Sequence, residues 1–214
     1  MPLAPPAPAE ATTVFGPALG LAERYAELLA GPGAEQGLIG PRESARLWDR
    51  HLMNCAAVAE LVPHPCSMID LGSGAGLPGV VLAMLLPDSE VVLLEPMARR
   101  AAFLEECVRE LGLGNAVVRC ARAEEVTGQL RADVVTARAV APMRRLAGLA
   151  LGLVRPGGVV LAIKGAGAAQ ELAEARPVLS RLGVRDVELR QAGRGKVSPP
   201  PTVIWLTASP GARQ

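Results

Sequence analysis

The sequence predicts an α/β fold, in which a mostly parallel sheet of seven strands follows a segment of N-terminal helices. From residue 67 onward, six short apolar runs alternate with helical patterns, and repeated strand–helix units of this length build a parallel, doubly wound sheet. The last two apolar runs are joined by residues 191–201, a Gly- and Pro-rich loop without a helical pattern. A short connection of this kind joins antiparallel strands, so we expect the seventh strand to be antiparallel.

The chain divides into three parts. Residues 1–16 start with a Pro- and Ala-rich stretch, which predicts a disordered tail. Residues 17–65 are expected to form the N-terminal helical segment, and residues 66–214 the domain that carries the sheet. Half of the 214 residues are apolar, which is enough for the core of one domain with an extension.

Two helices are expected before the sheet. The first spans residues 17–30, has Tyr25 on its packing side, and is stopped by the Gly-Pro-Gly sequence of residues 31–33. The second spans residues 42–61. We expect Trp48, on this second helix, to be a core residue.

The strands of the sheet are expected at residues 68–71, 91–95, 117–120, 133–137, 159–164, 184–190 and 202–207. The helices between the first six strands are expected at residues 80–86, 98–111, 123–130, 143–153 and 168–182. A seven-stranded sheet with an antiparallel last strand is the architecture of the Rossmann-like class I methyltransferases.

Composition and cysteine usage narrow the class of protein. The formal net charge is +1, so no overall field attracts a polyanion, and a basic surface has to come from local clustering. The four cysteines form no CxxC pair and have no His at ligand spacing, which favours buried thiols over disulfides or a metal site. No apolar stretch reaches the roughly 20 residues that span a bilayer, and no secretory signal opens the chain. We therefore expect a cytoplasmic monomer without metal or membrane contact.

The basic residues are almost all arginine. Of the 22, only Lys164 and Lys196 are lysines. One explanation of this preference for arginine is coding bias. The other is recognition of phosphates and bases, for which the planar guanidinium of Arg is better suited than the ammonium of Lys. The composition leaves both explanations open.

Residues 68–79, with the sequence Met-Ile-Asp-Leu-Gly-Ser-Gly-Ala-Gly-Leu-Pro-Gly, predict a nucleotide-type site, because glycines let the backbone turn sharply and approach a ligand. The loop also satisfies the G-x-G-x-x-G pattern of dinucleotide enzymes. However, its glycines follow Asp70 in the acid-x-Gly-x-Gly-x-Gly order typical of S-adenosylmethionine enzymes, and an acid suits a cationic amino-acid end better than a pyrophosphate. With the antiparallel last strand, this favours S-adenosyl-L-methionine as cofactor, bound by Asp70, Gly72 and Gly74.

Three further residues fit an adenosine-type ligand. Glu95 ends the second strand, where a carboxylate can accept both ribose hydroxyls in a dinucleotide or an adenosyl cofactor. Ala123 and Glu124 open the helix after the third strand, where adenine would lie. For Glu124, charge complementing the helix dipole is the alternative explanation.

The end of the fourth strand limits the chemistry. Residues 135–142 hold neither the Asn/Asp-Pro-Pro-aromatic tetrad of adenine amino methyltransferases nor the cysteine of cytosine C5 methyltransferases. Arg138 stands there instead, and an arginine cannot act as a general base. This favours a nucleophile that needs no deprotonation, such as guanine N7. The alternative role of Arg138 is an ion pair with Asp133, Glu124 or Asp70.

Several segments taken together resemble those of one family. They are Arg50-His51, residues 69–79, Arg122-Ala123-Glu124-Glu125, Arg138-Ala139 and Ala162-Ile163-Lys164-Gly165. In this order and spacing, over about residues 21–206, the chain resembles the bacterial small-subunit rRNA guanine-N(7) methyltransferases, the RsmG or GidB (glucose-inhibited division protein B) family, and within it the actinobacterial branch. The resemblance implies a guanosine in the 530 loop of 16S rRNA as substrate, within the small ribosomal subunit.

The resemblance also implies residue roles. The cofactor positions are Gly72, Leu77, Ala123, Glu124 and Arg138, with Arg138 beside the methionine carboxylate. The substrate is positioned by Arg50, His51 and Lys164, and no residue acts as general base. Residues 37–40 depart from the Asn-Leu-Thr type of segment found in many members, so no binding asparagine is carried over.

Arginines of residues 42–50 recur every four residues, which would place them on one face of the second helix. Like charges at this spacing disfavour an isolated helix, whereas a facing phosphate backbone would be attracted to them. The alternative is a solvated face whose charge is offset by Glu43 and Asp49. The expected RNA-binding residues are Arg42, Arg46, Arg50, Arg194 and Lys196.

Two other functions stay open. A small-molecule S-adenosylmethionine-dependent methyltransferase would need a closed apolar lid, against which the arginine face argues. The other possible function is that of a non-catalytic module that binds a nucleotide of the NAD type. S-Adenosylhomocysteine should stabilise the protein and NAD should not if the leading hypothesis is right.

Overall fold

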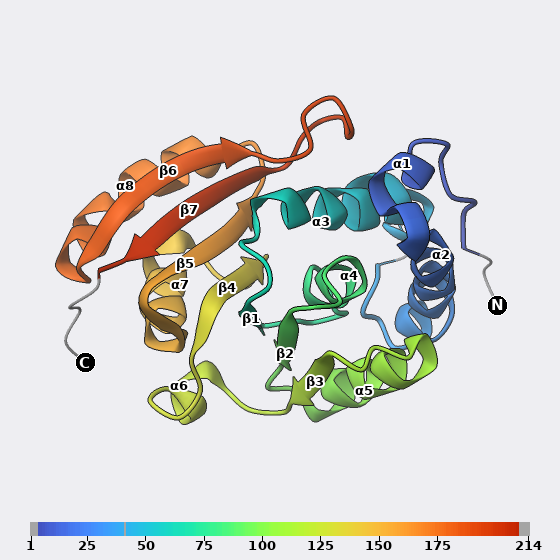
Figure 1. The fold of residues 1–214 in the computed structure, drawn as a ribbon, viewed down its shortest axis with the longest axis horizontal. Coiled ribbons are helices and arrows are strands. Elements are labelled where there is room, and N and C mark those ends of the chain that lie inside the picture. Colours follow the sequence, from blue (N-terminus) through green and yellow to red (C-terminus); the bar gives the residue numbers. More distant parts are fainter. Residues whose placement is uncertain (1–3, 41, 210–214) are drawn as a thin grey trace.

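A computed structural model describes residues 4–40 and 42–209, and its centre is a seven-stranded sheet in the order β3-β2-β1-β4-β5-β7-β6 (Figure 1). The strands are β1 (Ser67–Leu71), β2 (Glu90–Leu94), β3 (Ala116–Arg119), β4 (Ala132–Arg138), β5 (Val154–Lys164), β6 (Val184–Gln191) and β7 (Thr202–Ala208). Strand β7 runs antiparallel to both of its neighbours, and β1 to β5 pair in parallel. The predicted fold class is confirmed.

Helices cover both faces of this sheet. The α-helices are α1 (Ala11–Phe15), α2 (Leu19–Leu28), α3 (Met53–Val58), α4 (Gly79–Leu85), α5 (Ala98–Leu111), α6 (Ala123–Val126), α7 (Met143–Leu153) and α8 (Ala168–Arg181). Helices α4 and α5, with the N-terminal helices beside them, lie against β1–β3, whereas α7 and α8 lie against β4–β7 (Figure 1).

Alternation along each strand builds two cores, because successive side chains of a strand point to opposite faces. On β1, Met68 packs into the core shared with the N-terminal helices and α4, while Ile69 packs into the core beneath α7 and α8. Val134 and Val135 of the neighbouring β4 divide in the same way. The N-terminal helical segment therefore shares its core with one face of the sheet, and the predicted boundary at residue 65 is not a boundary between cores.

The N-terminal helices differ from the prediction in their form. The first continues past Leu28 as a π-turn, η2 (Leu29–Gly33), so the Gly-Pro-Gly sequence does not stop it. Pro32 lies inside this turn, and because proline has no backbone N–H it cannot donate the bond to the residue four before it that an α-helix would need there. The predicted helix over 42–61 is a composite of η3 (Ser44–Arg46, 3₁₀), η4 (Leu47–Leu52, π), α3 and η5 (Ala59–Leu61, 3₁₀).

Helix α6 is shorter than predicted and ends at Val126 rather than at residue 130. The hydroxyl of Thr127 donates to the carbonyl oxygen of Ala123 at 2.9 Å, and Gly128 follows with a φ of 84°. A glycine in this left-handed conformation ends a helix, because the next residue turns away from the axis.

The structure also differs from the disordered tail expected for residues 1–16, of which residues 1–3 lie outside the described part. Helix α1 forms within this stretch, and Phe15 at its end is buried. The Phe15 ring meets the Trp48 ring edge-on at 6.0 Å between centroids, and Trp48 Nε1 donates to the carbonyl oxygen of Pro5 at 2.8 Å. Burial of two large aromatic side chains outweighs the Pro- and Ala-rich composition of residues 4–16. Trp48 is a core residue, as predicted.

Among residues 4–40 and 42–209, no helix is long and apolar enough to cross a bilayer.

Candidate functional site

The predicted site residues meet along one edge of the sheet, where the parallel strands end. The glycine loop follows β1, Glu95 follows β2, Arg138 ends β4 and Lys164 ends β5. Asp70 on β1 pairs in register with Leu93 on β2 and Thr136 on β4, which fixes the ends of the three strands relative to one another. This is the edge at which ligands bind in open parallel sheets.

Close packing explains why two positions of the loop are glycine. A Cβ at Gly79 would lie 2.4 Å from Leu93 Cδ2, and one at Gly72 would lie 2.8 Å from Val140 Cγ2. Gly74 is different, since a Cβ there would find only the Gly72 carbonyl oxygen, at 3.8 Å. The space beside Gly74 is therefore open, and the predicted contact of Gly74 with a ligand stays a prediction.

Asp70 organises this loop from inside. Its Oδ2 accepts from the Ser73 hydroxyl at 2.6 Å and from the Gly79 amide at 2.9 Å, while Oδ1 accepts from the Thr136 hydroxyl at 3.0 Å. Burial raises the pKa of Asp70, and these hydrogen bonds and Arg138 oppose that shift. With 1% of its surface exposed, Asp70 holds the loop in shape rather than facing the ligand that the sequence assigns to it.

Tyr25 is a site residue whose role the sequence analysis missed. It reaches from α2 to the glycine loop, where its hydroxyl donates to the carbonyl oxygen of Ala75 at 2.5 Å. Burial is the main cause that raises the pKa of this phenol well above 10, so the hydroxyl keeps the proton that it donates. Its helical spacing indicated a packing position, and nothing in the pattern marked the hydroxyl.

Glu95 is buried and accepts two backbone amides, from Gly74 at 2.9 Å and from Met97 at 3.0 Å. It thus ties the glycine loop to the start of α5. Its predicted contact with a ribose stays a prediction. The next large side chain, Met97, is 48% exposed, an unusual place for an apolar residue and one that the sequence analysis did not single out.

The other predicted cofactor positions line the same edge. Ala123 is buried at the start of α6, and Glu124 beside it is exposed. The carboxylate of Glu125 accepts from the Arg122 amide at 2.9 Å, which caps this short helix. Leu77 is partly buried against the core at the far end of the glycine loop.

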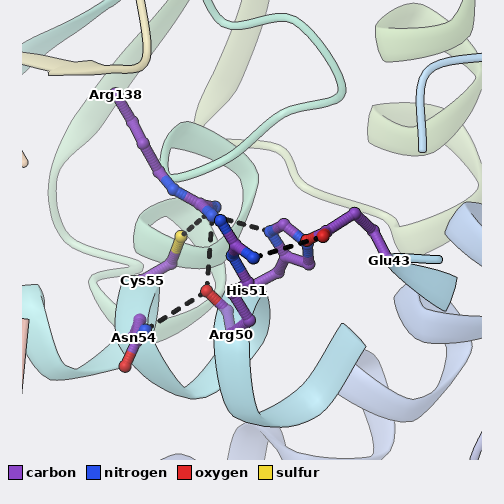
Figure 2. Close-up of polar contacts among 6 residues, drawn as sticks. All are labelled: Glu43, Arg50, His51, Asn54, Cys55 and Arg138. Atoms are coloured by element: carbon purple, nitrogen blue, oxygen red, sulfur yellow. Dashed lines mark hydrogen bonds and ion pairs between the residues drawn. The ribbon is translucent and has the colours of Figure 1, made fainter. Parts of the chain in front are cut away.

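Arg138 points into the N-terminal helical segment (Figure 2). Its Nη2 donates to His51 Nδ1 at 2.6 Å and to the carbonyl oxygen of Arg50 at 3.3 Å, and its Nη1 donates to Cys55 Sγ at 3.5 Å. The ion pair with Asp133, Glu124 or Asp70 that the sequence left open does not form. Asp133 pairs instead with Arg155 at 2.7 Å, because it lies at the opposite end of the same strand.

The polar contacts continue beyond Arg138. His51 Nε2 lies 2.9 Å from a carboxylate oxygen of Glu43, and the other oxygen of Glu43 accepts from Arg50 Nη1 at 3.3 Å (Figure 2). Sequence analysis assigned Glu43 only a charge-offsetting role. His51 is 9% exposed and lies behind Arg138 rather than at the surface.

A cavity of about 540 Å³ opens beside Arg138. Its lining includes Arg50, Arg138 and Lys164, three of the residues that the sequence assigned to the site, together with residues 199–202, where the last loop enters β7. Lys164 is held in place, since its Nζ donates to a carboxylate oxygen of Glu171 at 2.8 Å and to the carbonyl oxygen of Ala141 at 3.0 Å. His51 is not part of this lining.

The loop after β4 has one backbone feature that no sequence signal revealed. Ala139 has a φ of 55°, the only non-glycine value in the left-handed region among the residues that the structure describes. This conformation costs an alanine about 1 kcal/mol. It turns the chain so that Val140 packs over Gly72, and it leaves Arg138 and Ala139 at the cavity wall.

The predicted arginine face does not form as a helical stripe. Arg42 precedes the helical turns, Arg46 ends a 3₁₀ turn and Arg50 lies in a π-turn, so a spacing of four does not align them. Arg194 donates to Gln191 at 2.9 Å, and Lys196 lies 3.3 Å from Glu60. Contact of these residues with RNA stays a prediction.

The model of the family "GidB: rRNA small subunit methyltransferase G" matches residues 19–198. The chain belongs to this family. Its relatives include the ribosomal RNA small subunit methyltransferases G of Thermobifida fusca, 57% identical over 93% of this chain and 84% of the relative, and of Streptomyces coelicolor, 50% identical over 97% and 88%. The predicted family and its actinobacterial branch are confirmed.

Solved structures agree on the fold of this rRNA small subunit methyltransferase G family member. The structure of M. jannaschii TYW2 in complex with AdoMet has a TM-score of 0.58 at 16% identity, covering 75% of this chain and 76% of that one. A ribosomal protein L11 methylase from Lactobacillus delbrueckii has a TM-score of 0.58 at 13% identity, covering 75% and 79%. Membership of the family makes the protein an S-adenosylmethionine-dependent methyltransferase. In residues 4–40 and 42–209, no three His, Cys, Asp or Glu side chains gather as metal ligands.

Proposed function

We propose that this enzyme transfers a methyl group from S-adenosylmethionine to N7 of a guanosine in the 530 loop of 16S rRNA, in line and without a general base. The observation that carries this proposal is the cavity beside Arg138. None of the described residues that line it is Asp, Glu, His, Cys or Tyr, and its basic side chains are Arg50, Arg138 and Lys164. Guanine N7 has a free lone pair, so the reaction requires no residue to remove a proton before transfer.

The cofactor, when bound, supplies an activated methyl group on its sulfonium. The loop around Gly74 is open for the ligand, and we assign Gly72, Gly74 and Leu77 to its contact surface. Arg138 would hold the methionine carboxylate, since no carboxylate among the described residues is bonded to it. Charge-assisted hydrogen bonds of this kind are the strong ones.

The adenosine end would lie at the next two strand ends. We assign the ribose to Glu95, and the adenine to the surface between Met97 and the start of α6 at Ala123 and Glu124. Met97 fits this place because its exposed, polarisable side chain can pack on a ring. Asp70 contributes by shaping the loop.

The protein would supply alignment for the transfer rather than proton chemistry. Lys164 is fixed by Glu171 and Arg50 by Glu43, so both present cations at set positions of the cavity wall. Held geometry lowers the barrier of a transfer between two bound reactants. The RNA backbone would reach Arg42, Arg46, Arg50, Arg194 and Lys196, and the substrate would be 16S rRNA in the small subunit, met by a monomer in the cytoplasm.

The test is transfer of labelled methyl groups to small subunits that lack the modification, beside naked 16S rRNA. Mapping of alkali-labile guanosines should give one position, in the 530 loop. Label in neither substrate, or label on another atom, would refute the proposal. In parallel, S-adenosylhomocysteine should raise the melting temperature and NAD should not, whereas the reverse would favour a nucleotide-binding module.

A further inference from the structure

Among the residues that the structure describes, the guanidinium of Arg138 is held only by acceptors that carry no negative charge. They are the Nδ1 of His51, the carbonyl oxygen of Arg50 and the thiol of Cys55. Burial raises the pKa of the Cys55 thiol, so this group stays neutral as well. A carboxylate in any of these places would hold the arginine equally well, but it would cancel the charge. Arg138 is thus fixed in position while its positive charge remains available to a ligand.

The contacts define the protonation of His51. An arginine can only donate hydrogen bonds, so His51 Nδ1, 2.6 Å from Nη2, has to be the acceptor and carries no proton. The proton of the neutral ring is then on Nε2, which donates to the Glu43 carboxylate at 2.9 Å. Glu43 selects this tautomer because it can only accept (Figure 2).

The charges around His51 favour the same state. Burial and then Arg138 lower the pKa of His51, and Arg50 adds to this, while the hydrogen bond and the charge of Glu43 oppose it. The ring is therefore neutral at pH 7. Protonation below that would remove the acceptor on Nδ1 and place a second cation beside Arg138.

We propose that His51 and Glu43 are positioning residues: Glu43 fixes the Nε2–H tautomer of His51, and His51 Nδ1 aims the guanidinium of Arg138 at the anionic group of the cofactor without neutralising it. The proposal rests on the assignment of Arg138 to the methionine carboxylate. It gives His51 a role toward the cofactor instead of the RNA contact that the sequence suggested.

Three substitutions of His51 separate this role from plain packing. In His51→Asn an oxygen replaces Nδ1 as a neutral acceptor, in His51→Asp the acceptor is charged, and in His51→Leu it is lost. By calorimetry, His51→Asn should bind S-adenosylhomocysteine within about threefold of wild type, and the other two should bind about tenfold more weakly. In His51→Asp and His51→Leu, the KM for S-adenosylmethionine should rise by a larger factor than kcat falls. Glu43→Gln should also weaken the binding of S-adenosylhomocysteine, because its amide no longer selects the Nε2–H tautomer of His51. Its matched control is Glu174→Gln, which changes an exposed carboxylate on α8 and should bind like wild type.

Acid pH gives a second readout. Wild-type affinity for S-adenosylhomocysteine should fall as the pH drops from 8 to 5, whereas the affinity of His51→Asn should not. In the ligand-free protein, ¹⁵N spectra should show His51 with its proton on Nε2, and Arg138→Gln should raise the pKa of His51 because a neighbouring cation is removed.

Each outcome decides the proposal. Equal affinity of His51→Asn and His51→Asp, full affinity of His51→Leu with a native melting curve, or a proton on Nδ1 would overturn it. So would wild-type protein that does not bind S-adenosylhomocysteine. If wild type binds this ligand and the variants behave as expected but no RNA is methylated, the positioning role stands and the proposed RNA substrate falls.

Discussion

Removal of the Tyr25 hydroxyl tests whether the N-terminal helices hold the glycine loop. In Tyr25→Phe the ring that fills the buried space of Tyr25 is kept, and only the 2.5 Å hydrogen bond to the Ala75 carbonyl oxygen is lost. A buried acceptor left without its donor costs about 1–3 kcal/mol. We expect the free energy of unfolding to fall by about 2 kcal/mol, at the middle of that range.

The same change should weaken cofactor binding. Without the hydrogen bond, the loop between Gly74 and Gly76 is less ordered before the ligand binds. Ordering this loop on binding costs free energy, which lowers the affinity. Affinity for S-adenosylhomocysteine should fall by about threefold to tenfold, which corresponds to about 0.6–1.4 kcal/mol. Urea denaturation measures the stability and calorimetry the affinity.

The control is Ser209→Ala, which removes a hydroxyl bonded to the carbonyl oxygen of Gly183 at the far end of β6 and β7. This variant should lose stability but keep its affinity for the ligand. If Tyr25→Phe is as stable as wild type, or loses stability with unchanged affinity, the hydroxyl does not position the loop.

Three further predictions follow from other contacts. Gly79→Ala should lose about 1–3 kcal/mol of stability in urea denaturation, since its Cβ would lie 2.4 Å from Leu93 Cδ2, and an unchanged midpoint would contradict the packing. The pKa of Asp133 is lowered from 3.8 to about 2, mainly by hydrogen bonds from Ser67. The ionised carboxylate therefore stabilises the fold above pH 4, and this stabilisation is lost as the pH falls through about 2. Acid titration should show Asp133→Asn less stable than wild type at pH 5, with the difference in stability between the two proteins disappearing toward pH 2. Arg42→Glu combined with Arg46→Glu should reduce methylation of small subunits at least about tenfold at 150 mM salt while affinity for S-adenosylhomocysteine stays within about twofold, and unchanged methylation would exclude this surface as an RNA contact.

The sequence predicted the strands to within one residue at each end, because apolar runs bounded by Gly and Pro are local signals; the exception is β5, which begins at Val154 rather than at residue 159. Helices α5 and α7 match their predicted bounds, since their apolar periodicity continues to a clear end. The N-terminal segment was predicted less well. Its π- and 3₁₀-turns, and the order of residues 4–16, depend on packing around Phe15 and Trp48, which no local pattern contains.

The candidate site divides in the same way. The sequence predicted that Gly74, Glu95 and Arg138 lie together, because the ends of parallel strands meet at one edge whatever the details of packing. Tyr25 and Glu43 could not, since they act through contacts with Ala75 and His51 that lie many residues away or depend on an irregular turn.

By itself, then, the sequence determined the order of strands and helices, the cofactor class and the absence of a base at Arg138, because these follow from residue type and spacing. Only the tertiary structure decided what Arg138 faces. Its hydrogen bonds to the N-terminal helices go to neutral acceptors instead of the carboxylates that the sequence allowed. The direction of a side chain and its distance from distant residues are set only when the chain folds.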